Sequence, residues 1–331
     1  MKIVIATPFY PPEIGVLGMY AAGIQEAFER LGHEVEIVSF GAVRHLPPLI
    51  RHIAYFKRVR AAARHVAFVL ALDTWSVGLP ALFAAKREDV PFLVRVGGDF
   101  LWESYVERTK EPVRLSEFYL KPRGLSLKER LIRKGIERLV RDADALLFNT
   151  RFLRDLWQRA YHVPAEKANI VENFVPPTSM NEPSLTRVFV CAGRNIALKN
   201  RETLERAFKR AKEKYPKIEL DMRLLPPAEH AARMARCYAV IIPSISEVSS
   251  NTAIDAISAG KPFIMTDDTG TKERLGECGL FIDTRSEDAL VGAIETLLNP
   301  ENYEYHRARI KEFSFTHSWD EMAREILKAR S

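Results

Sequence analysis

The segment that decides the fold reads AVIIPSISEVSSNTAIDAISAGKP, residues 239–262. Its first four residues are an apolar run that Pro243 ends, which is typical of the carboxyl end of a buried parallel strand. Ser249, Ser250 and Asn251 are good helix-start residues, and the apolar residues after them recur at helical spacing as far as Gly260. The segment therefore predicts a strand, a loop and a helix in succession, as in an open α/β sheet.

Two carboxylates flank the predicted helix start. Glu247 lies in the loop, and Asp255 falls on the first turns of the helix. Ligands of open α/β sheets bind where strands end and helices begin, and the N–H groups of a helix start favour an anion such as a diphosphate. Because a carboxylate accepts two hydrogen bonds at once, both residues suit the vicinal diols of a sugar ring and of a ribose. The alternative is a solvated loop Glu and a surface helix Asp.

This arrangement resembles the Glu, seven residues, Glu element of retaining glycosyltransferases of family 4, which have the GT-B architecture. The resemblance implies that Glu247 holds the transferred sugar and that Asp255 holds the nucleotide ribose. It further implies that the helix start, Ser249, Ser250, Asn251 and Thr252, binds the diphosphate. The segment departs from the family pattern at Asp255, which is one methylene shorter than Glu, and at Val248, Ser249 and Ser250, where the family has glycine and aromatic residues.

A pair of cations follows the first predicted strand of the second half of the chain. Residues 192–200 read AGRNIALKN and precede a helix that begins near Arg201. Arg194 and Lys199 match the family's Gly-Arg and following Lys, so the resemblance gives them the catalytic role of stabilising the departing diphosphate. The alternative is two exposed basic residues near a helix start, where cations are unfavourable. The family's fold needs no metal, and we expect no cofactor besides the nucleotide-sugar donor.

The loop after the first strand carries glycines where a backbone must approach a ligand closely. Gly15 and Gly18 lie in this loop, which resembles the glycine-rich loop that in the family closes over the diphosphate and the acceptor; Val16 replaces the usual second glycine of an adjacent pair. After the strand 92–96, Gly97 stands where many relatives have a His, which makes Asp99 the candidate for an acceptor-side residue. Asp99 could equally cap a helix.

Strand-like apolar runs alternate with helical patterns through most of the chain, which predicts parallel βαβ units. The runs are residues 3–6, 35–39, 92–96, 145–148 and 169–171, then 187–193, 218–223, 239–242, 263–266 and 280–282. We expect an α/β fold with two Rossmann-like domains whose parallel sheets face a central cleft. The predicted boundaries are an acceptor-side domain at 1–175, a proline-rich linker at 176–186, a donor-binding domain at 187–314, and a helix at 315–331 that crosses back to the first domain.

Positive charge gathers in the first half of the chain. Residues 1–175 carry 26 Lys and Arg against 20 Asp and Glu, whereas residues 176–331 carry 23 of each. The basic region 44–64 interleaves its cations with apolar residues and contains no acid. That pattern suits an anionic membrane surface or a lipid-linked acceptor, and equally a core-packed helix with one solvated face. No nucleic-acid motif accompanies it, so we do not expect a nucleic-acid partner.

The N-terminus lacks a signal-peptide pattern, and the longest apolar run, Val66 to Leu72, is too short to span a bilayer. We therefore expect a cytoplasmic protein, with a peripheral position at the inner membrane face as the alternative. The predicted function is that of a metal-independent retaining glycosyltransferase of the hexosyltransferase class, acting on a glycan or lipid-linked glycan. The alternatives are a GT-B-type phosphorylase or epimerase and a non-catalytic protein that binds sugar nucleotides.

Overall fold

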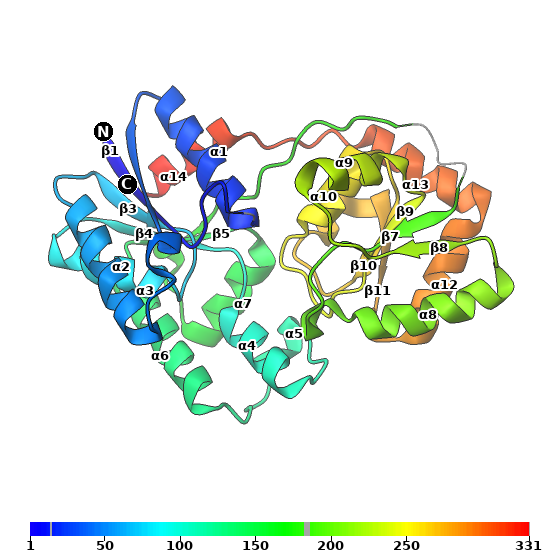
Figure 1. Cartoon of the computed structure of the whole chain (residues 1–331), viewed down its shortest axis with the longest axis horizontal. Coiled ribbons are helices and arrows are strands. Elements are labelled where there is room, and N and C mark those ends of the chain that lie inside the picture. The colour runs from blue at the N-terminus through cyan, green and yellow to red at the C-terminus, as the bar shows by residue number, and fades with distance from the viewer. Residues whose placement is uncertain (14, 182–185, 331) are drawn as a thin grey trace. The chain divides into compact units, whose positions relative to one another are not determined.

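The computed structural model describes residues 1–13, 15–181 and 186–330. By their mutual contacts these residues form two compact units, each built around one parallel sheet (Figure 1). Unit 1 comprises residues 1–101, 124–174 and 317–331, and unit 2 comprises residues 102–123 and 175–316. Part of the predicted linker, residues 182–185, lies outside the described residues.

The sheet of unit 1 has six parallel strands in the order β2-β1-β3-β4-β5-β6. Its strands are β1 (Lys2–Thr7), β2 (Glu34–Ser39), β3 (Phe68–Ala71), β4 (Phe92–Val96), β5 (Ala145–Phe148) and β6 (Ala168–Ile170). The apolar run that is too short to cross a bilayer is β3, which pairs with both β1 and β4 inside the sheet. Within the described residues, no helix is both long and apolar enough to cross a membrane.

Helices cover both faces of this sheet, with α1 and α14 on one side and α2, α3 and α6 on the other (Figure 1). The helices of unit 1 are α1 (Val16–Arg30), α2 (Pro48–Ala62), α3 (Gly78–Arg87), α6 (Leu127–Asp142), α7 (Arg151–Tyr161) and α14 (Trp319–Ala329), with 3-10 turns η1 (Phe40–Val43) and η2 (Ala165–Lys167). Since side chains alternate along a strand, Ile3 and Ile5 share one face, where they pack in one core with Ile24 of α1 and Met322 of α14.

The last helix, α14, is part of unit 1. Its first residue, Trp319, stacks on Phe174 with ring centroids 4.9 Å apart and meets Tyr20 of α1 edge-on. A methyl group added at Gly23 would lie 2.5 Å from the Trp319 ring, so Gly23 is what lets α1 and α14 approach each other.

The sheet of unit 2 has five parallel strands in the order β11-β10-β9-β7-β8. Its strands are β7 (Val188–Val190), β8 (Glu219–Asp221), β9 (Ala239–Ile242), β10 (Phe263–Thr266) and β11 (Gly279–Ile282). Its helices are α4 (Phe100–Thr109, from Trp102), α5 (Leu115–Phe118), α8 (Arg201–Lys214), α9 (Pro227–Arg236), α10 (Asn251–Ser258), α11 (Lys272–Leu275), α12 (Glu287–Leu298) and α13 (Pro300–Glu312), with 3-10 turns η3 (Ala197–Lys199) and η4 (Gly276–Cys278). Alternate residues of β9 enter two cores, Ile241 with α8 and α12, and Val240 with α9 and α10.

Both sheets share one topology, in which the strand order reverses next to the first strand. The reversal lies between β1 and β3 in unit 1 and between β7 and β9 in unit 2. In open parallel sheets, ligands bind outside the carboxyl ends of the strands at such a switch point, because the loops diverge there. In unit 2 the two loops at this point are those that follow β7 and β9, and they carry the predicted cations and Glu247.

The segment 102–123 departs from the expected boundaries. All of residues 1–175 were expected in the first domain, whereas residues 102–123 make their contacts with unit 2. Arg114 forms ion pairs with Asp267 and Asp283, and the backbone N–H of Leu115 donates to Ser246 Oγ. Because these partners are distant in the sequence, no local sequence pattern predicts the contacts.

Candidate functional site

The loops after β7 and β9 meet at the switch point of unit 2. The Ile245 N–H donates to the Leu198 carbonyl at 3.0 Å, which joins the two loops through the backbone. The Lys199 Nζ then lies 2.5 Å from Glu247 Oε1. Ser244 Oγ donates to the same carboxylate oxygen at 2.6 Å. Two residues that the sequence analysis selected from separate motifs therefore form one ion pair, and Ser244 is a third member that it did not select.

The turn that brings Lys199 to Glu247 depends on a glycine. Gly193 has φ of +130°, a backbone conformation that side chains rarely adopt. A methyl group at Gly193 would also touch the Lys199 side chain at 3.7 Å. After this turn the chain forms η3, which ends at Lys199, and Asn200 then adopts the left-handed conformation before α8 begins.

The ion pair favours the charged form of Lys199. Burial disfavours its ammonium group, but the nearby Glu247 carboxylate attracts and hydrogen-bonds it more strongly, so the pKa of Lys199 is raised. Glu103, on α4 in unit 2, acts in the same direction on this pKa. Lys199 therefore stays a cation at neutral pH, in a position to attract an anionic ligand.

Backbone hydrogen bonds fix Glu247 against the neighbouring loop after β10. Its N–H donates to the Asp268 carbonyl at 3.1 Å, and its carbonyl accepts from the Gly270 N–H at 3.2 Å. One further bridge pairs Glu247 with Thr269. The Glu247 side chain is 13% exposed, so part of the carboxylate is open to solvent while its backbone is held.

Helix α10 begins where the sequence predicts. Ser250 is its N-cap, with its hydroxyl accepting from the Ala253 N–H at 3.3 Å. Ser250 is only 3% exposed, and its side chain caps the helix. Asn251 and Thr252 are the first two residues of the helix, and Ser249 precedes the cap.

Asp255 lies one turn into α10 and is half exposed, with 51% of its side-chain surface open. Protein atoms around it penalise the charged form, which raises the pKa of Asp255 to about 6. An ionisable side chain of α9 lies beside it: His230 Nε2 is 3.9 Å from Asp255 Oδ2. Burial, followed by the repulsion of Arg233, lowers the pKa of His230. The contact between α9 and Asp255 was not predicted from the sequence.

Arg194 is exposed and lies in the turn before η3. Its guanidinium has no partner in the part of the chain that the structure describes, in contrast to Lys199. It is therefore a second cation on the same loop that is available to a ligand.

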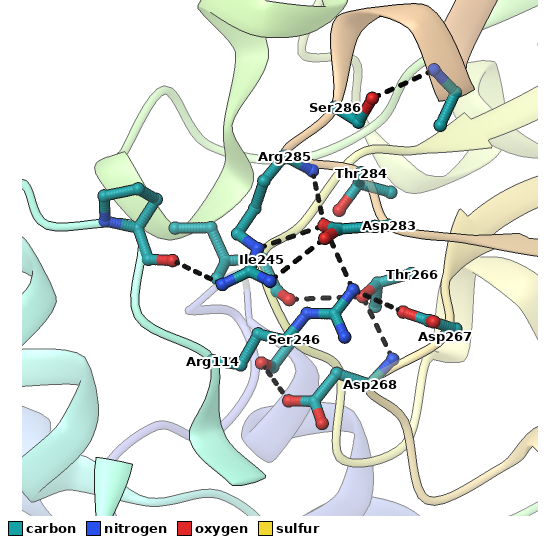
Figure 2. A network of polar contacts seen from close by, with 12 residues as sticks. Arg114, Ile245, Ser246, Thr266, Asp267, Asp268, Asp283, Thr284, Arg285 and Ser286 are labelled. Carbon is teal, nitrogen blue, oxygen red and sulfur yellow. Dashed lines mark hydrogen bonds and ion pairs between the residues drawn. The ribbon is translucent and has the colours of Figure 1, made fainter. Parts of the chain in front are cut away.

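The 102–123 segment is anchored to the loops that follow β9, β10 and β11 (Figure 2). Arg114 Nη2 lies 2.6 Å from Asp267 Oδ1 and 3.0 Å from Asp283 Oδ1. Hydrogen bonds from Arg285, helped by the charge of Arg114, lower the pKa of Asp283 to about 2. This arrangement holds together the ends of two strands beside the Glu247 loop.

The same segment also touches the two loops that carry the candidate residues. The Leu115 N–H donates to Ser246 Oγ at 2.9 Å, and Ser246 Oγ in turn donates to Asp268 Oδ2 at 2.5 Å. At the other loop, the Leu198 N–H donates to Glu107 Oε1 at 3.3 Å. Ser246 and Leu198 are the direct neighbours of Glu247 and Lys199 in the sequence, so the segment supports both partners of the ion pair.

In unit 1, Gly15 precedes α1 and Gly18 lies in its first turn. A methyl group at Gly18 would lie 3.3 Å from the Glu13 carbonyl, and so the loop folds tightly onto the helix start. Arg44 holds this loop from the side through an ion pair with Glu13 at 2.9 Å and a hydrogen bond to the Pro8 carbonyl at 2.7 Å. Arg44, expected as part of the basic region, is thus partly neutralised.

Asp99 directly precedes α4 and is fully buried. Its Oδ2 accepts a hydrogen bond from the indole of Trp157 at 2.9 Å. Because Asp99 is fully buried, a role in acceptor binding would require the surrounding side chains to move. Near it, a methyl group at Gly97 would lie 2.2 Å from the Arg95 guanidinium, so Arg95 fills the space next to this glycine.

The chemistry of the unit 2 site follows from these contacts. The site offers two cations, Lys199 and Arg194, and the carboxylate of Glu247. The start of α10 lies beside them at the carboxyl edge of the parallel sheet. Among the described residues, no group of three or more His, Cys, Asp or Glu side chains could hold a metal ion.

The chain was compared with protein families, curated sequences and solved structures. The family described as Glycosyltransferase Family 4 matches residues 17–179, and the one described as Glycosyl transferases group 1 matches residues 170–300. No curated protein sequence matches the chain significantly.

Solved structures share the fold at low sequence identity. Anabaena HepE in complex with UDP is 14% identical with a TM-score of 0.69, over 99% of both chains. Sucrose-phosphate synthase from Thermosynechococcus elongatus is 13% identical with a TM-score of 0.72, over 99% of this chain and 97% of that one. An α,α-trehalose-phosphate synthase (UDP-forming) from Burkholderia vietnamiensis is 10% identical with a TM-score of 0.67, over 99% of both chains.

Proposed function

Because the chain belongs to the family 4, group 1 glycosyltransferases and has their GT-B fold, we propose that it is a retaining, metal-independent enzyme that glycosylates a hydroxyl acceptor. The donor is a nucleoside-diphosphate sugar. The acceptor is a glycan or a lipid-linked glycan, and the reaction releases the nucleoside diphosphate.

The observation that carries the proposal is the Lys199–Glu247 pair at the switch point of unit 2. Before the donor binds, the two charges satisfy each other. On binding, Lys199 turns to the diphosphate oxygens, and Glu247 is released to accept hydrogen bonds from the sugar hydroxyls. As the bond from the sugar to the diphosphate breaks, negative charge grows on the leaving oxygens, which Lys199 and Arg194 stabilise.

The remaining residues of unit 2 bind the donor. The start of α10, from Ser249 to Thr252, lies next to Glu247 in the chain and suits the diphosphate through its backbone N–H groups and the helix dipole. Asp255 accepts hydrogen bonds from the ribose. In unit 1, the loop with Gly15 and Gly18 contributes to binding of the diphosphate and the acceptor, and Asp99 belongs to the acceptor side.

Uridine nucleotides are the first donors to test. HepE has been solved with UDP, with UDP and glucose, and with UDP-glucose. We propose that this chain uses a UDP-sugar, since its candidate donor site lies on the same fold.

A panel of UDP-, GDP- and ADP-sugars, screened by thermal shift, tests donor binding, because a ligand specific to the folded state raises the melting temperature. We expect at least one UDP-sugar to raise it. No shift with any member of the panel would overturn the proposal.

Product analysis then tests the reaction type. Proton NMR of the glycoside formed from the accepted donor should show the anomeric configuration of the donor sugar. An inverted product would contradict retention. Turnover that needs inorganic phosphate, or an epimerised sugar nucleotide without any acceptor product, would assign the site to a phosphorylase or an epimerase instead.

A further inference from the structure

Unit 1 contains a groove of about 500 Å³ between α2 and α3, within the range of small-molecule sites. Seven of its eight lining residues are apolar, and the eighth is His52. The apolar lining includes Leu49, Ile53 and Phe56 from α2, Leu79 and Phe83 from α3, and Trp75 just before α3. We call this feature the α2–α3 groove.

The groove exposes large apolar side chains to solvent. Leu49 is 79% exposed, Ile53 is 53% exposed and Phe83 is 45% exposed. Single exposed apolar residues are ordinary on a protein surface, but a contiguous set that lines a hollow marks a binding site. The packing of α2 does not need these residues, because Tyr55, Val59 and Ala62 form its buried side.

Helix α2, which lines the groove, is positively charged. Helix α2 contains four cations and no acid. Arg60 and Arg64 share Glu88, whereas Arg51, Lys57 and Arg58 have no ion pair among the described residues. The uncompensated cations on a helix that also lines an apolar hollow match an occupant with an aliphatic part and an anionic part.

The topology places the groove on the functional edge of unit 1. Helices α2 and α3 follow β2 and β3, so their first turns start from the carboxyl edge of the parallel sheet. Leu49, His52 and Ile53 lie in the first half of α2, and Leu79 and Pro80 lie in the first turn of α3. The loop with Gly15 and Gly18, which follows β1, starts from the same edge.

We propose that the α2–α3 groove binds the aliphatic chain of an anionic lipid, which makes a lipid-linked molecule the acceptor of this enzyme. The link between the groove and catalysis rests on the proposed function. Binding of the aliphatic chain to the groove does not depend on that function. A second copy of the protein is a poorer occupant, because a symmetric contact would bring the same unpaired cations face to face.

Binding is measured with three soluble probes: decyl phosphate below its micelle concentration, decyl maltoside as the same chain without charge, and inorganic phosphate as the head group alone. Calorimetry gives the affinity of each probe. We expect decyl phosphate to bind most tightly, decyl maltoside more weakly, and phosphate not measurably.

Matched variants locate the site. Ile53→Asp should weaken decyl phosphate binding at least tenfold, whereas Leu127→Asp, at an exposed apolar residue of α6, should leave it unchanged. Lys57→Glu should weaken decyl phosphate but not decyl maltoside, and Lys134→Glu on α6 serves as its control. Both lining and control residues are exposed, so these variants should fold normally, which their melting temperatures check.

The outcomes separate the two proposals. Equal binding by Ile53→Asp and Leu127→Asp, or no binding of decyl phosphate at all, overturns the groove site. Binding to phosphatidylglycerol vesicles without binding of decyl phosphate assigns the surface to a membrane instead, and dimerisation abolished by Ile53→Asp assigns it to a second copy. The thermal shift given by a UDP-sugar should be the same in Ile53→Asp as in the parent, so failure of donor binding would be seen separately.

Discussion

Arg114 Nη2 lies 2.6 Å from Asp267 Oδ1, although 153 residues separate the two in the sequence. The Arg114 side chain is 15% exposed and also reaches Asp283, so one guanidinium joins the ends of β10 and β11. Because Leu115 and Glu107 hold the neighbours of Glu247 and Lys199, the segment that carries Arg114 is part of the architecture of the proposed donor site.

Arg114→Ala should loosen the donor site without removing any group that touches the donor. Loss of both ion pairs should lower stability by roughly 1–2 kcal/mol, and the KM for the donor should rise more than kcat falls. Arg114→Lys should restore little, since one ammonium cannot reproduce a planar fork between two carboxylates. Arg236→Ala, at an exposed residue of α9, is the control for thermal melting and donor kinetics. An unchanged KM in Arg114→Ala would contradict the positioning role.

Lys199→Ala and Glu247→Gln should both reduce turnover, by different routes. Under the proposed mechanism Lys199 stabilises the leaving diphosphate, and removal of such a group typically costs about 10²–10³ in kcat. Glu247→Gln keeps the shape of the side chain but loses the charge that balances Lys199 and that, in the proposal, orients the sugar. Lys217→Ala and Glu213→Gln, at exposed sites of unit 2, should behave as the parent enzyme. Steady-state kinetics measure the kcat of all four variants. If Lys199→Ala and Glu247→Gln have the same kcat as the two controls, neither residue takes part in the mechanism.

Donor affinity should depend on pH through Asp255. Its pKa is raised to about 6, so the carboxylate that we propose as the ribose ligand forms only as the pH rises through 6. UDP-glucose is the suitable probe because its phosphates do not titrate in this range. Calorimetry from pH 5 to pH 7.5 should show affinity rising in the parent and staying flat in Asp255→Asn. A parallel rise in both proteins would assign the pH dependence to another group, such as His230.

The raised pKa of Asp255 also has a consequence for stability. Because the folded state holds this proton more tightly than the unfolded state, ionisation of Asp255 disfavours folding, and the penalty develops as the pH rises from about 4 to 6. Asp255→Asn should therefore melt at a higher temperature than the parent at pH 7.5, with the difference vanishing near pH 4. The effect should be small, since half of the side chain is open to solvent.

Gly23→Ala and Gly292→Ala should have opposite effects on stability. The added methyl at Gly23 would collide with the Trp319 ring, and overpacking of this kind costs about 1–3 kcal/mol. At Gly292, in α12, the methyl meets nothing within 4 Å and improves helix propensity by roughly 0.5–1 kcal/mol. Thermal melting distinguishes the two. A neutral Gly23→Ala would mean that α14 packs less tightly on α1 than its contacts indicate.

Turnover should persist in excess EDTA. The charge of the departing diphosphate is to be met by Lys199, Arg194 and the α10 start, so removal of divalent cations should change kcat by less than about twofold, far short of the tenfold that 1.36 kcal/mol in the barrier would produce. Loss of activity that Mg²⁺ or Mn²⁺ restores would show that these cations are insufficient.

The parts of the fold that could be predicted are those whose signals are local. The apolar run of β9, the break at Pro243 and the cap at Ser250 are neighbours in the sequence, and the structure has the strand, loop and helix in that order. The parallel βα units of both domains were predicted for the same reason, since each unit leaves its own pattern, whereas the GT-B architecture was predicted from the resemblance to a known family. The run Val66 to Leu72 was considered only as a membrane segment because its place as β3 depends on pairing with β1 and β4.

What could not be predicted depends on pairs of residues far apart in the chain. Arg114 looks like any surface arginine until Asp267 and Asp283 are brought beside it. Asp99 was an open choice between a ligand contact and a helix cap, and its partner Trp157 lies 58 residues away. Such long-range contacts produce no pattern within the sequence of a single helix or strand. They can therefore be identified only from the folded structure.

The split of unit 2 into two stretches of sequence has a consequence for how the protein is made. Arg114 leaves the ribosome 153 residues ahead of its partner Asp267, a delay of about 8–30 s at 5–20 residues per second. During that time Arg114 lacks both of its ion-pair partners, Asp267 and Asp283. Unit 2 can therefore complete its fold only late in translation, and a fragment that ends near residue 175 would carry an unpaired piece of the other unit.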